Sequence, residues 1–349
     1  MSVRKAVQQL AEYNFKAYDA SIKLDQNELP YDVSDEIKTE ICRRIMAQPL
    51  NRYPERQGES LRAQLAGHLG ISDDMLMLGN GSNTIIRRII ESCGIDQRVL
   101  TVKPTFAVYE LDSHLLDPEA LCAVALSESF ELDVDALKAE MTQGSGVVFI
   151  ANPAAPTGNL HGREELIELL EQAQTHNWTF VIDEAYYQFA GCDHLDLLKD
   201  YDNLILLRTF SKAYGLAGVR VGYCIGNPQL IAQVRKSPPQ FSISSLQLIT
   251  ASCVLEMAQD QLSEYLSEAH SERERLLSGL RALGVECLDS VCNFFLMRFA
   301  DPQAIHEALR ERGVLVRRQD GLVSGALRVS VGNPQENDRF LAAMRDILS

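Results

Sequence analysis

The stretch "NLILLRTFSKAYGLAGVR" (203–220) decides the fold. It begins with an apolar run typical of a buried strand, reaches the pair Ser211-Lys212, and continues through a glycine-rich segment to Arg220. A lysine at the end of a buried strand is rare unless it is paired or used chemically. Lys212 is therefore the first candidate functional residue.

Other short apolar runs flank this stretch. "GVVFIA" (146–151) and "TFVID" (179–183) enclose the helical pattern "REELIELLEQAQTHN" (163–177), and "GVRVGYCIG" (218–226) follows. Buried strands that alternate with amphipathic helices predict an α/β fold, with a mostly parallel central sheet and helices on both faces. Ligands bind at the carboxyl ends of such strands. The polar residues at those ends are Asn152, Asp183, Ser211 and Lys212.

The pattern changes after residue 244. Long helical stretches run to about residue 283, and shorter strand and helix patterns follow, which predict a smaller α+β domain. We expect a large domain over 30–244 and a small C-terminal domain over 245–349. The N-terminal arm, 1–29, is expected to pack against the small domain.

Composition limits the possible partners. The 349 residues carry a formal charge of −15, which disfavours nucleic acid and anionic membranes. The N-terminus lacks the apolar core of a signal peptide, and no apolar run approaches the ~20 residues of a membrane span. The eight cysteines form no CxxC pair. We predict a cytoplasmic protein with reduced cysteines and no metal site.

Asp183 and Lys212 are more informative together than apart. Alone, Asp183 reads as a helix cap or turn residue, and Lys212 as a solvated lysine at the rim of the sheet. As a pair they match the needs of a pyridine-ring cofactor, which forms a Schiff base with a lysine and needs a carboxylate at its ring nitrogen. The lysine, released when substrate replaces it, can then move a proton as a general base.

A phosphate on that cofactor needs an anion site. In "LGNGSNTIIRRII" (78–90), glycines permit a tight turn and Ser82 or Asn83 precedes a helix whose backbone amides can face an anion. Ser211 and Arg220 can add a hydroxyl and a charge-assisted hydrogen bond. In "KPTFAVYE" (103–110), Tyr109 can stack on the cofactor ring, whereas Phe106 fits a core role equally well.

With these features assembled, the chain resembles the fold-type I pyridoxal-phosphate (PLP) aminotransferases over nearly its whole length. "SKAYGLAGVRVG" with an upstream "DEAY" carries that resemblance, and "LNRYPERQ" (50–57) and "LRVSVG" (327–332) point to the histidinol-phosphate aminotransferases among them. Further matching segments are "KLDQNELPYD" (23–32), "NPAAPTG" (152–158) and "GVLVRRQ" (313–319).

The resemblance implies roles for the residues around the cofactor. Lys212 would form the Schiff base and Asp183 would pair with the pyridine nitrogen. Tyr186 would bind the phenolic oxygen and Tyr109 would stack on the ring. The phosphate would be held by Ser82 and Asn83 through their backbone and by Ser211 and Arg220 through their side chains.

The resemblance also implies how substrate and partner subunit contribute. Tyr53 would reach the cofactor phosphate of the neighbouring subunit, so that a homodimer would build shared active sites. Arg328 would clamp a substrate carboxylate. Arg317 and Tyr18 would recognise the far end of the substrate, and Asn27 would line the pocket from the arm.

Two positions depart from the family pattern. Ala155 stands where many relatives carry an asparagine that donates to the phenolic oxygen, so we expect Tyr186 alone to hold that oxygen. Asn83-Thr84 stands where the loop often carries an acidic residue, and uncharged residues there should leave phosphate binding intact.

The reaction implied is amino transfer from L-histidinol phosphate to 2-oxoglutarate, by a ping-pong route. Alternatives within the class are an aromatic amino-acid aminotransferase and a PLP-dependent decarboxylase of a phosphorylated amino acid, since these share the cofactor residues. A non-catalytic PLP-binding regulatory module is a different class. A dinucleotide-binding oxidoreductase is disfavoured, because no G-x-G-x-x-G follows the first strand.

Overall fold

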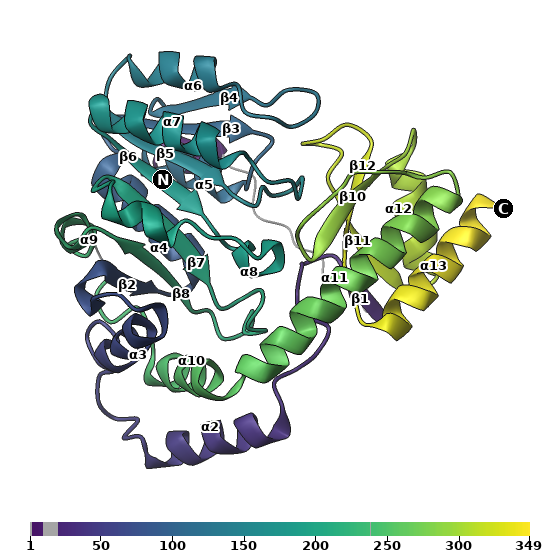
Figure 1. The fold of residues 1–349 in the computed structure, drawn as a ribbon, viewed down its shortest axis with the longest axis horizontal. Helices are drawn as coiled ribbons and strands as arrows, with labels where there is room; N and C mark the ends of the chain where they lie inside the picture. The colour runs from purple at the N-terminus through teal and green to yellow at the C-terminus, as the bar shows by residue number, and fades with distance from the viewer. Residues whose placement is uncertain (1, 10–19, 238) are drawn as a thin grey trace.

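The computed structural model describes residues 2–9, 20–237 and 239–349, which form two sheets with helices around them (Figure 1). The larger sheet has seven strands. In spatial order they are β2 (Leu76–Gly79), β8 (Gly222–Gly226), β7 (Leu204–Thr209), β6 (Trp178–Asp183), β5 (Gly146–Ala151), β3 (Arg98–Lys103) and β4 (Leu121–Ala125). Strand β8 is antiparallel to both neighbours, and the remaining pairs are parallel.

Helices cover both faces of the larger sheet. One face packs against α4 (Gly81–Cys93), α5 (Val108–Leu116) and α9 (Pro228–Val234). The opposite face packs against α2 (Asp35–Ala47), α3 (Glu59–Leu69), α6 (Val134–Met141), α7 (Arg163–Thr175) and α10 (Ser245–Met257). Successive residues of a strand enter different cores, as Val181 and Ile182 do in β6, because side chains alternate across a sheet. The predicted α/β class is confirmed.

The register of the central strands places their ends side by side. Ala151 of β5 pairs with Asp183 of β6, and Asp183 pairs with Leu207 of β7. Because β5, β6 and β7 are parallel, their carboxyl ends meet at one edge of the sheet. The segment that carries Lys212 leaves β7 at that edge.

The smaller sheet has five strands. In spatial order they are β1 (Ile22–Leu24), β11 (Val314–Arg318), β12 (Ala326–Ser330), β10 (Phe294–Arg298) and β9 (Glu286–Cys287). Its core is closed by α11 (Gln259–Ala282), α12 (Pro302–Glu311) and α13 (Pro334–Leu348). Strand β1 belongs to the N-terminal arm and pairs in parallel with β11, Ile22 opposite Val314. The arm is thus an edge strand of the C-terminal sheet.

Helix α10 packs differently from the expectation for the region after residue 244. Its buried residues, including Leu248 and Val254, join the core under the larger sheet. The long helix α11 then crosses to the smaller sheet (Figure 1). The boundaries of the two domains stay a prediction, but α10 packs with the large sheet.

Short elements complete the description: α1 (Lys5–Gln9), α8 (Tyr187–Ala190), and the 3-10 turns η1 (Asp73–Met75) and η2 (Leu195–Lys199). Within the described ranges, we find no helix whose length and apolar character would suit it to crossing a membrane.

Candidate active site

A cavity of about 440 Å³ lies at the carboxyl edge of the larger sheet. Five parts of the chain form its walls: the ends of β5, β6 and β7 with the segments that follow them, the start of α4, the segment of Phe106 and Tyr109 at the start of α5, the arm with β1, and β12. The volume is in the range of sites for small ligands. Lys212, Asp183 and Tyr186 all line it.

Lys212 presents its amine to this cavity. Its Nζ donates to the backbone oxygen of Gln26 at 3.1 Å and lies 3.5 Å from that of Asn27. Burial, with Arg328 and Arg220 nearby, lowers the pKa of Lys212 to about 7, against the opposing charges of Glu28 and Asp183. An amine in these surroundings loses its proton near neutral pH, as a nucleophile or base requires.

Asp183 ends strand β6 and is held from two sides. Its Oδ2 accepts a hydrogen bond from the Tyr109 hydroxyl at 2.6 Å, and its Oδ1 accepts one from the backbone amide of Ala185 at 3.1 Å. Burial raises the pKa of Asp183 to about 6, although these two hydrogen bonds and Lys212 act in the opposite direction. A cationic group in the cavity would stabilise the ionised form of Asp183.

Tyr109, expected to stack on the cofactor ring, lines the cavity and is tightly packed, and its stacking role stays a prediction. Its fully buried ring stacks on Phe149, with 5.0 Å between ring centroids, and its hydroxyl is engaged by Asp183. The partly exposed Phe106 lies edge-on to Tyr109 and also lines the cavity. Both aromatic residues therefore stay candidates for stacking on a cofactor ring.

Tyr186 and Asn27 form a hydrogen-bonded pair at the other side of the cavity. The Asn27 side-chain amide donates to the Tyr186 hydroxyl at 2.9 Å. Ser330 of β12 fixes Asn27, because its hydroxyl donates to Asn27 Oδ1 at 3.0 Å and accepts from the Asn27 backbone amide at 2.8 Å. Since the Tyr186 oxygen already accepts a hydrogen bond, its own proton is available for an acceptor in the cavity.

The start of α4 forms an anion cup with the segment after β7. The N-cap residue, Asn80, makes no side-chain cap bond, so the first amides of the helix remain available to a ligand. Arg220 donates to the Ser211 hydroxyl at 3.1 Å. A Cβ at Gly81 would lie 2.5 Å from Arg220 Nη2, and one at Gly222 would lie 2.5 Å from the amide nitrogen of Ser82.

This cup fits the phosphate of PLP. The glycines allow the backbone and Arg220 to approach each other more closely than a side chain would permit. Arg220 itself has a left-handed φ of 62°, an uncommon conformation for a residue other than glycine. With an amine, a carboxylate and a hydroxyl around one cavity, the donor set matches the functional groups of that cofactor.

Comparison with known proteins identifies the family. Residues 19–344 match the family described as Aminotransferase class I and II. The chain is 39% identical to a histidinol-phosphate aminotransferase of Deinococcus radiodurans, covering 98% of this chain and 95% of that protein. The chain belongs to the class I and II aminotransferase family. The resemblance inferred from the sequence is confirmed.

Two further matches agree with this assignment. A histidinol-phosphate aminotransferase of Methylibium petroleiphilum is 36% identical, with 99% of this chain and 95% of that protein covered. The structure of histidinol-phosphate aminotransferase from Sinorhizobium meliloti, in complex with pyridoxal-5'-phosphate, superimposes with a TM-score of 0.87 at 23% identity, covering 99% of this chain and 97% of that one. This second likeness concerns the fold.

The two candidate substrate arginines of this aminotransferase are neighbours across β11 and β12. Arg317 and Arg328 pair in register, so their side chains share one face of the small sheet. Arg328 lines the cavity, and its Nη2 donates to the backbone oxygen of Asp25 at 2.9 Å. Its guanidinium carbon lies 5.5 Å from the ring centroid of Phe294. Of the two, Arg328 is the one placed at the cavity wall.

Tyr53 lies apart from the cavity of its own chain. Its side chain is 83% exposed and rests against Phe241, with 5.0 Å between ring centroids. This placement is compatible with a role toward a neighbouring subunit, which stays a prediction. Tyr18 lies outside the described residues.

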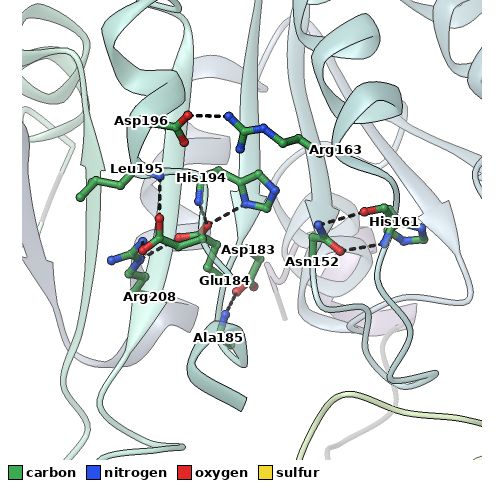
Figure 2. A network of polar contacts seen from close by, with 11 residues as sticks. Asn152, His161, Arg163, Asp183, Glu184, Ala185, His194, Leu195, Asp196 and Arg208 are labelled. Atoms are coloured by element: carbon green, nitrogen blue, oxygen red, sulfur yellow. Dashed lines mark hydrogen bonds and ion pairs between the residues drawn. The ribbon is translucent and has the colours of Figure 1, made fainter. Parts of the chain in front are cut away.

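The position of Ala155 bears on the missing asparagine. Ala155 lines the cavity, whereas nearby Asn152 is turned toward a separate turn of the chain. The side chain of Asn152 accepts from the backbone amide of His161 at 2.9 Å and donates to its backbone oxygen at 3.4 Å (Figure 2). Asn152 is therefore committed to structure and does not replace the asparagine that relatives carry.

Two charged residues beside the site have no role predicted from the sequence. Glu184 follows Asp183, and Arg208 precedes Lys212 by four positions, inside otherwise apolar runs. Their signal was available, because a fully buried charge requires a partner.

Proposed function

We propose that this chain catalyses PLP-dependent amino transfer between L-histidinol phosphate and 2-oxoglutarate in histidine biosynthesis. The products are imidazole-acetol phosphate and glutamate. The observation that carries the proposal is the convergence of the Lys212 amine and the Asp183 carboxylate on one cavity beside an anion cup. When bound, PLP supplies an electron sink for the substrate carbon that loses its proton.

The residues of the chain have separate tasks in holding this cofactor. Asp183 faces the ring nitrogen, and the Tyr109 hydroxyl keeps the carboxylate in place. Tyr109 would stack on the ring, and the partly exposed Phe106 lines the cavity beside it. Tyr186 donates to the phenolic oxygen, with Asn27 orienting its hydroxyl.

Phosphate binding falls to the start of α4. Ser82 and Asn83 line the cavity at the start of α4, where their backbone amides would bind the phosphate, and Ser211 and Arg220 would supply the hydroxyl and the charge. Lys212 would hold PLP through its amine. That amine, with a pKa lowered to about 7, is the group that would accept and return a proton at the substrate carbon.

Substrate recognition rests on Arg328. L-histidinol phosphate has no carboxylate, so the guanidinium meets a phosphate in one half-reaction and the carboxylate of 2-oxoglutarate or glutamate in the other. Arg317, in register with Arg328, adds positive charge on the same face of the sheet. Tyr18 stays a candidate for the far end of the substrate.

We also propose a cytoplasmic homodimer. The exposed Tyr53 and Phe241 pair is the surface expected to meet the partner subunit, where Tyr53 reaches the phosphate. All eight cysteines are free, which supports a reducing compartment.

Absorbance of the PLP-loaded protein tests the proposed function. Addition of L-histidinol phosphate should convert the visible band of the bound cofactor to that of its amine form, and addition of 2-oxoglutarate should reverse the change. L-Phenylalanine at the same concentration should act at least about a hundredfold more slowly, because it offers no phosphate to Arg328. Equal rates with phenylalanine would favour an aromatic aminotransferase, and an unchanged spectrum with every amine would refute transamination.

A further inference from the structure

A buried ion pair connects the two strands that carry the reactive groups. Glu184 Oε2 accepts a hydrogen bond from Arg208 Nε at 2.7 Å (Figure 2). The two residues are 0% and 1% exposed. The cost of removing both charges from water is of the order of several kcal/mol per ion, so the pair must be completed by further contacts.

Neighbouring residues add further contacts to the pair. His194 donates its backbone amide to Glu184 Oε1 at 2.8 Å, and its Nδ1 lies at the same distance from that oxygen. Asp193 Oδ2 lies 3.3 Å from Arg208 Nη2, and the Arg208 guanidinium covers the ring of Tyr187 at 4.0 Å. Burial alone would lower the pKa of Arg208, but the charge of Glu184 raises it, so Arg208 stays cationic.

The pair lies directly behind the active site. Glu184 follows Asp183, and alternation along the strand turns the two side chains to opposite faces of the sheet. The backbone amide of Glu184 donates to the oxygen of Leu207 at 2.8 Å, one residue before Arg208. Lys212 follows Arg208 by four residues. The ion pair therefore holds together the ends of β6 and β7, where Asp183 and the segment with Lys212 are located.

The charges of the pair also act on Asp183. The groups facing Asp183 are the Tyr109 hydroxyl from α5, Lys212 after β7, and Tyr186 and Glu184 from its own segment. The anion of Glu184 disfavours ionisation of Asp183. Arg208, whose Nε lies 2.7 Å from Glu184 Oε2, balances that negative charge. Since a buried ion pair is a weak source of stability, a role in setting the site accounts for it better than a role in folding alone.

We propose that Glu184 and Arg208 are positioning residues that hold the ends of β6 and β7 together, and that their opposite charges balance each other behind the Asp183 carboxylate, which pairs with the cofactor's ring nitrogen. The inference rests on the proposed PLP-dependent function. It adds two residues, on the far face of the sheet, to those that determine how the site works.

Cofactor binding to the apoprotein tests this without measuring turnover. The probes are PLP and its 1-deaza analogue, in which a carbon replaces the ring nitrogen. The ratio of their dissociation constants isolates the contact with Asp183, because every other contact is common to both. The ratio is measured from pH 5 to 9, and Asp183→Asn gives the value expected when the contact is lost. Preference for PLP should fall at acid pH as Asp183 gains a proton.

The preference for PLP falls below a certain pH, which we call the acid limb. Substitutions of Arg208 and of Glu184 should shift this acid limb in opposite directions. Arg208→Met leaves Glu184 uncompensated, so the limb should move up by about one pH unit, equal to about tenfold in the preference for PLP within that window. Glu184→Gln leaves Arg208 uncompensated, so the limb should move down. A loss of packing alone would weaken binding of both probes and would not reverse sign between the variants. Arg163→Gln, which breaks the exposed pair with Asp196 (Figure 2), is the matched control and should change nothing.

The outcomes separate the two proposals. An acid limb that stays fixed in both variants, or moves in the same direction in both, overturns the positioning role. If Arg208→Met does not fold, the downward shift in Glu184→Gln decides by its presence or absence. Wild-type protein that binds PLP no better than the deaza analogue at any pH would instead contradict the proposed role of Asp183, and with it the proposed function.

Discussion

At the residue scale, Lys212 shows how a functional residue can lower the stability of the folded chain. Its amine is buried beside Arg328 and Arg220, and its pKa falls from 10.5 to about 7. Below pH 7 both the folded and the unfolded chain carry the charge, and the full cost of burying it remains. Between about 7 and 10.5 only the unfolded chain binds the proton, so stability rises with pH across that window.

Replacing the amine should therefore stabilise the apoprotein. Lys212→Met is expected to raise the unfolding temperature by about 2–4 °C at pH 6, and the gain should shrink as pH approaches 10. Calorimetry of the apoproteins at several pH values measures this. The same variant should lose at least about a hundredfold in transamination, because the general base is gone. A gain in stability that is independent of pH would contradict the shifted pKa.

Ala155 offers a second test at the scale of one side chain. Ala155→Asn restores an amide at the cavity wall, where it can donate to the phenolic oxygen of bound PLP. A hydrogen bond to the charged form favours that form, so the visible band of the loaded protein should titrate at a lower pH than in the wild type, by about half a unit or more. Asn152→Ala is the control, because that amide is bound to His161. Identical titrations for Ala155→Asn and wild type would mean that the new amide does not reach the oxygen.

Single residues also show how far the site can be predicted from the sequence alone. Asp183 and Lys212 could be found because strands that read as parallel must end at a common edge. The hydrogen bond from Tyr109 to Asp183 could not be predicted, because it depends on how α5 is oriented against β6, which no local pattern records. Ala155 was identified as a departure, but the commitment of Asn152 to His161 is a tertiary contact and appears only in three dimensions.

At the element scale, helix α4 and the segment after β7 depend on one close approach. Gly81 has a φ of +73°, and a Cβ there would lie 2.5 Å from Arg220 Nη2. Gly81→Ala must therefore displace Arg220 or the start of the helix, and should weaken PLP binding by about tenfold or more. Fluorescence titration of the apoprotein measures the affinity. Gly67→Ala in α3 is the control, since nothing lies within 4 Å of a Cβ there and the residue does not line the cavity. Equal losses in both variants would argue against a specific cup.

The elements themselves were largely predictable. The runs at 146–151, 179–183 and 203–209 correspond to β5, β6 and β7, because continuous apolar stretches between amphipathic helices have few other solutions. Helix α10 was harder to place. Its sequence is apolar on all sides, so it could belong to either core, and its packing against α2 and α3 settles the matter.

At the scale of the whole molecule, the proposed dimer predicts complementation. If Tyr53 serves the partner's site, Lys212→Ala and Tyr53→Ala homodimers are each impaired. A hybrid dimer has one site with both residues intact. Equal amounts of the two variants are mixed, and their dimers are dissociated and allowed to reassociate. The mixture should recover about a quarter of wild-type activity, since half the dimers are hybrid and each hybrid has one working site. Activity no greater than the mean of the two parents would mean that each chain builds its site alone.

The pairing of β1 with β11 links the order of synthesis to the finished site. Ile22 is made almost three hundred residues before its partner Val314, yet the arm that continues from β1 supplies the backbone oxygen nearest the Lys212 amine. A chain still on the ribosome, or cut short before β11, thus has no strand against which to anchor that arm. Incomplete molecules would carry an uncovered amine and a loose N-terminal segment, two marks by which proteases or chaperones could tell them from finished enzyme.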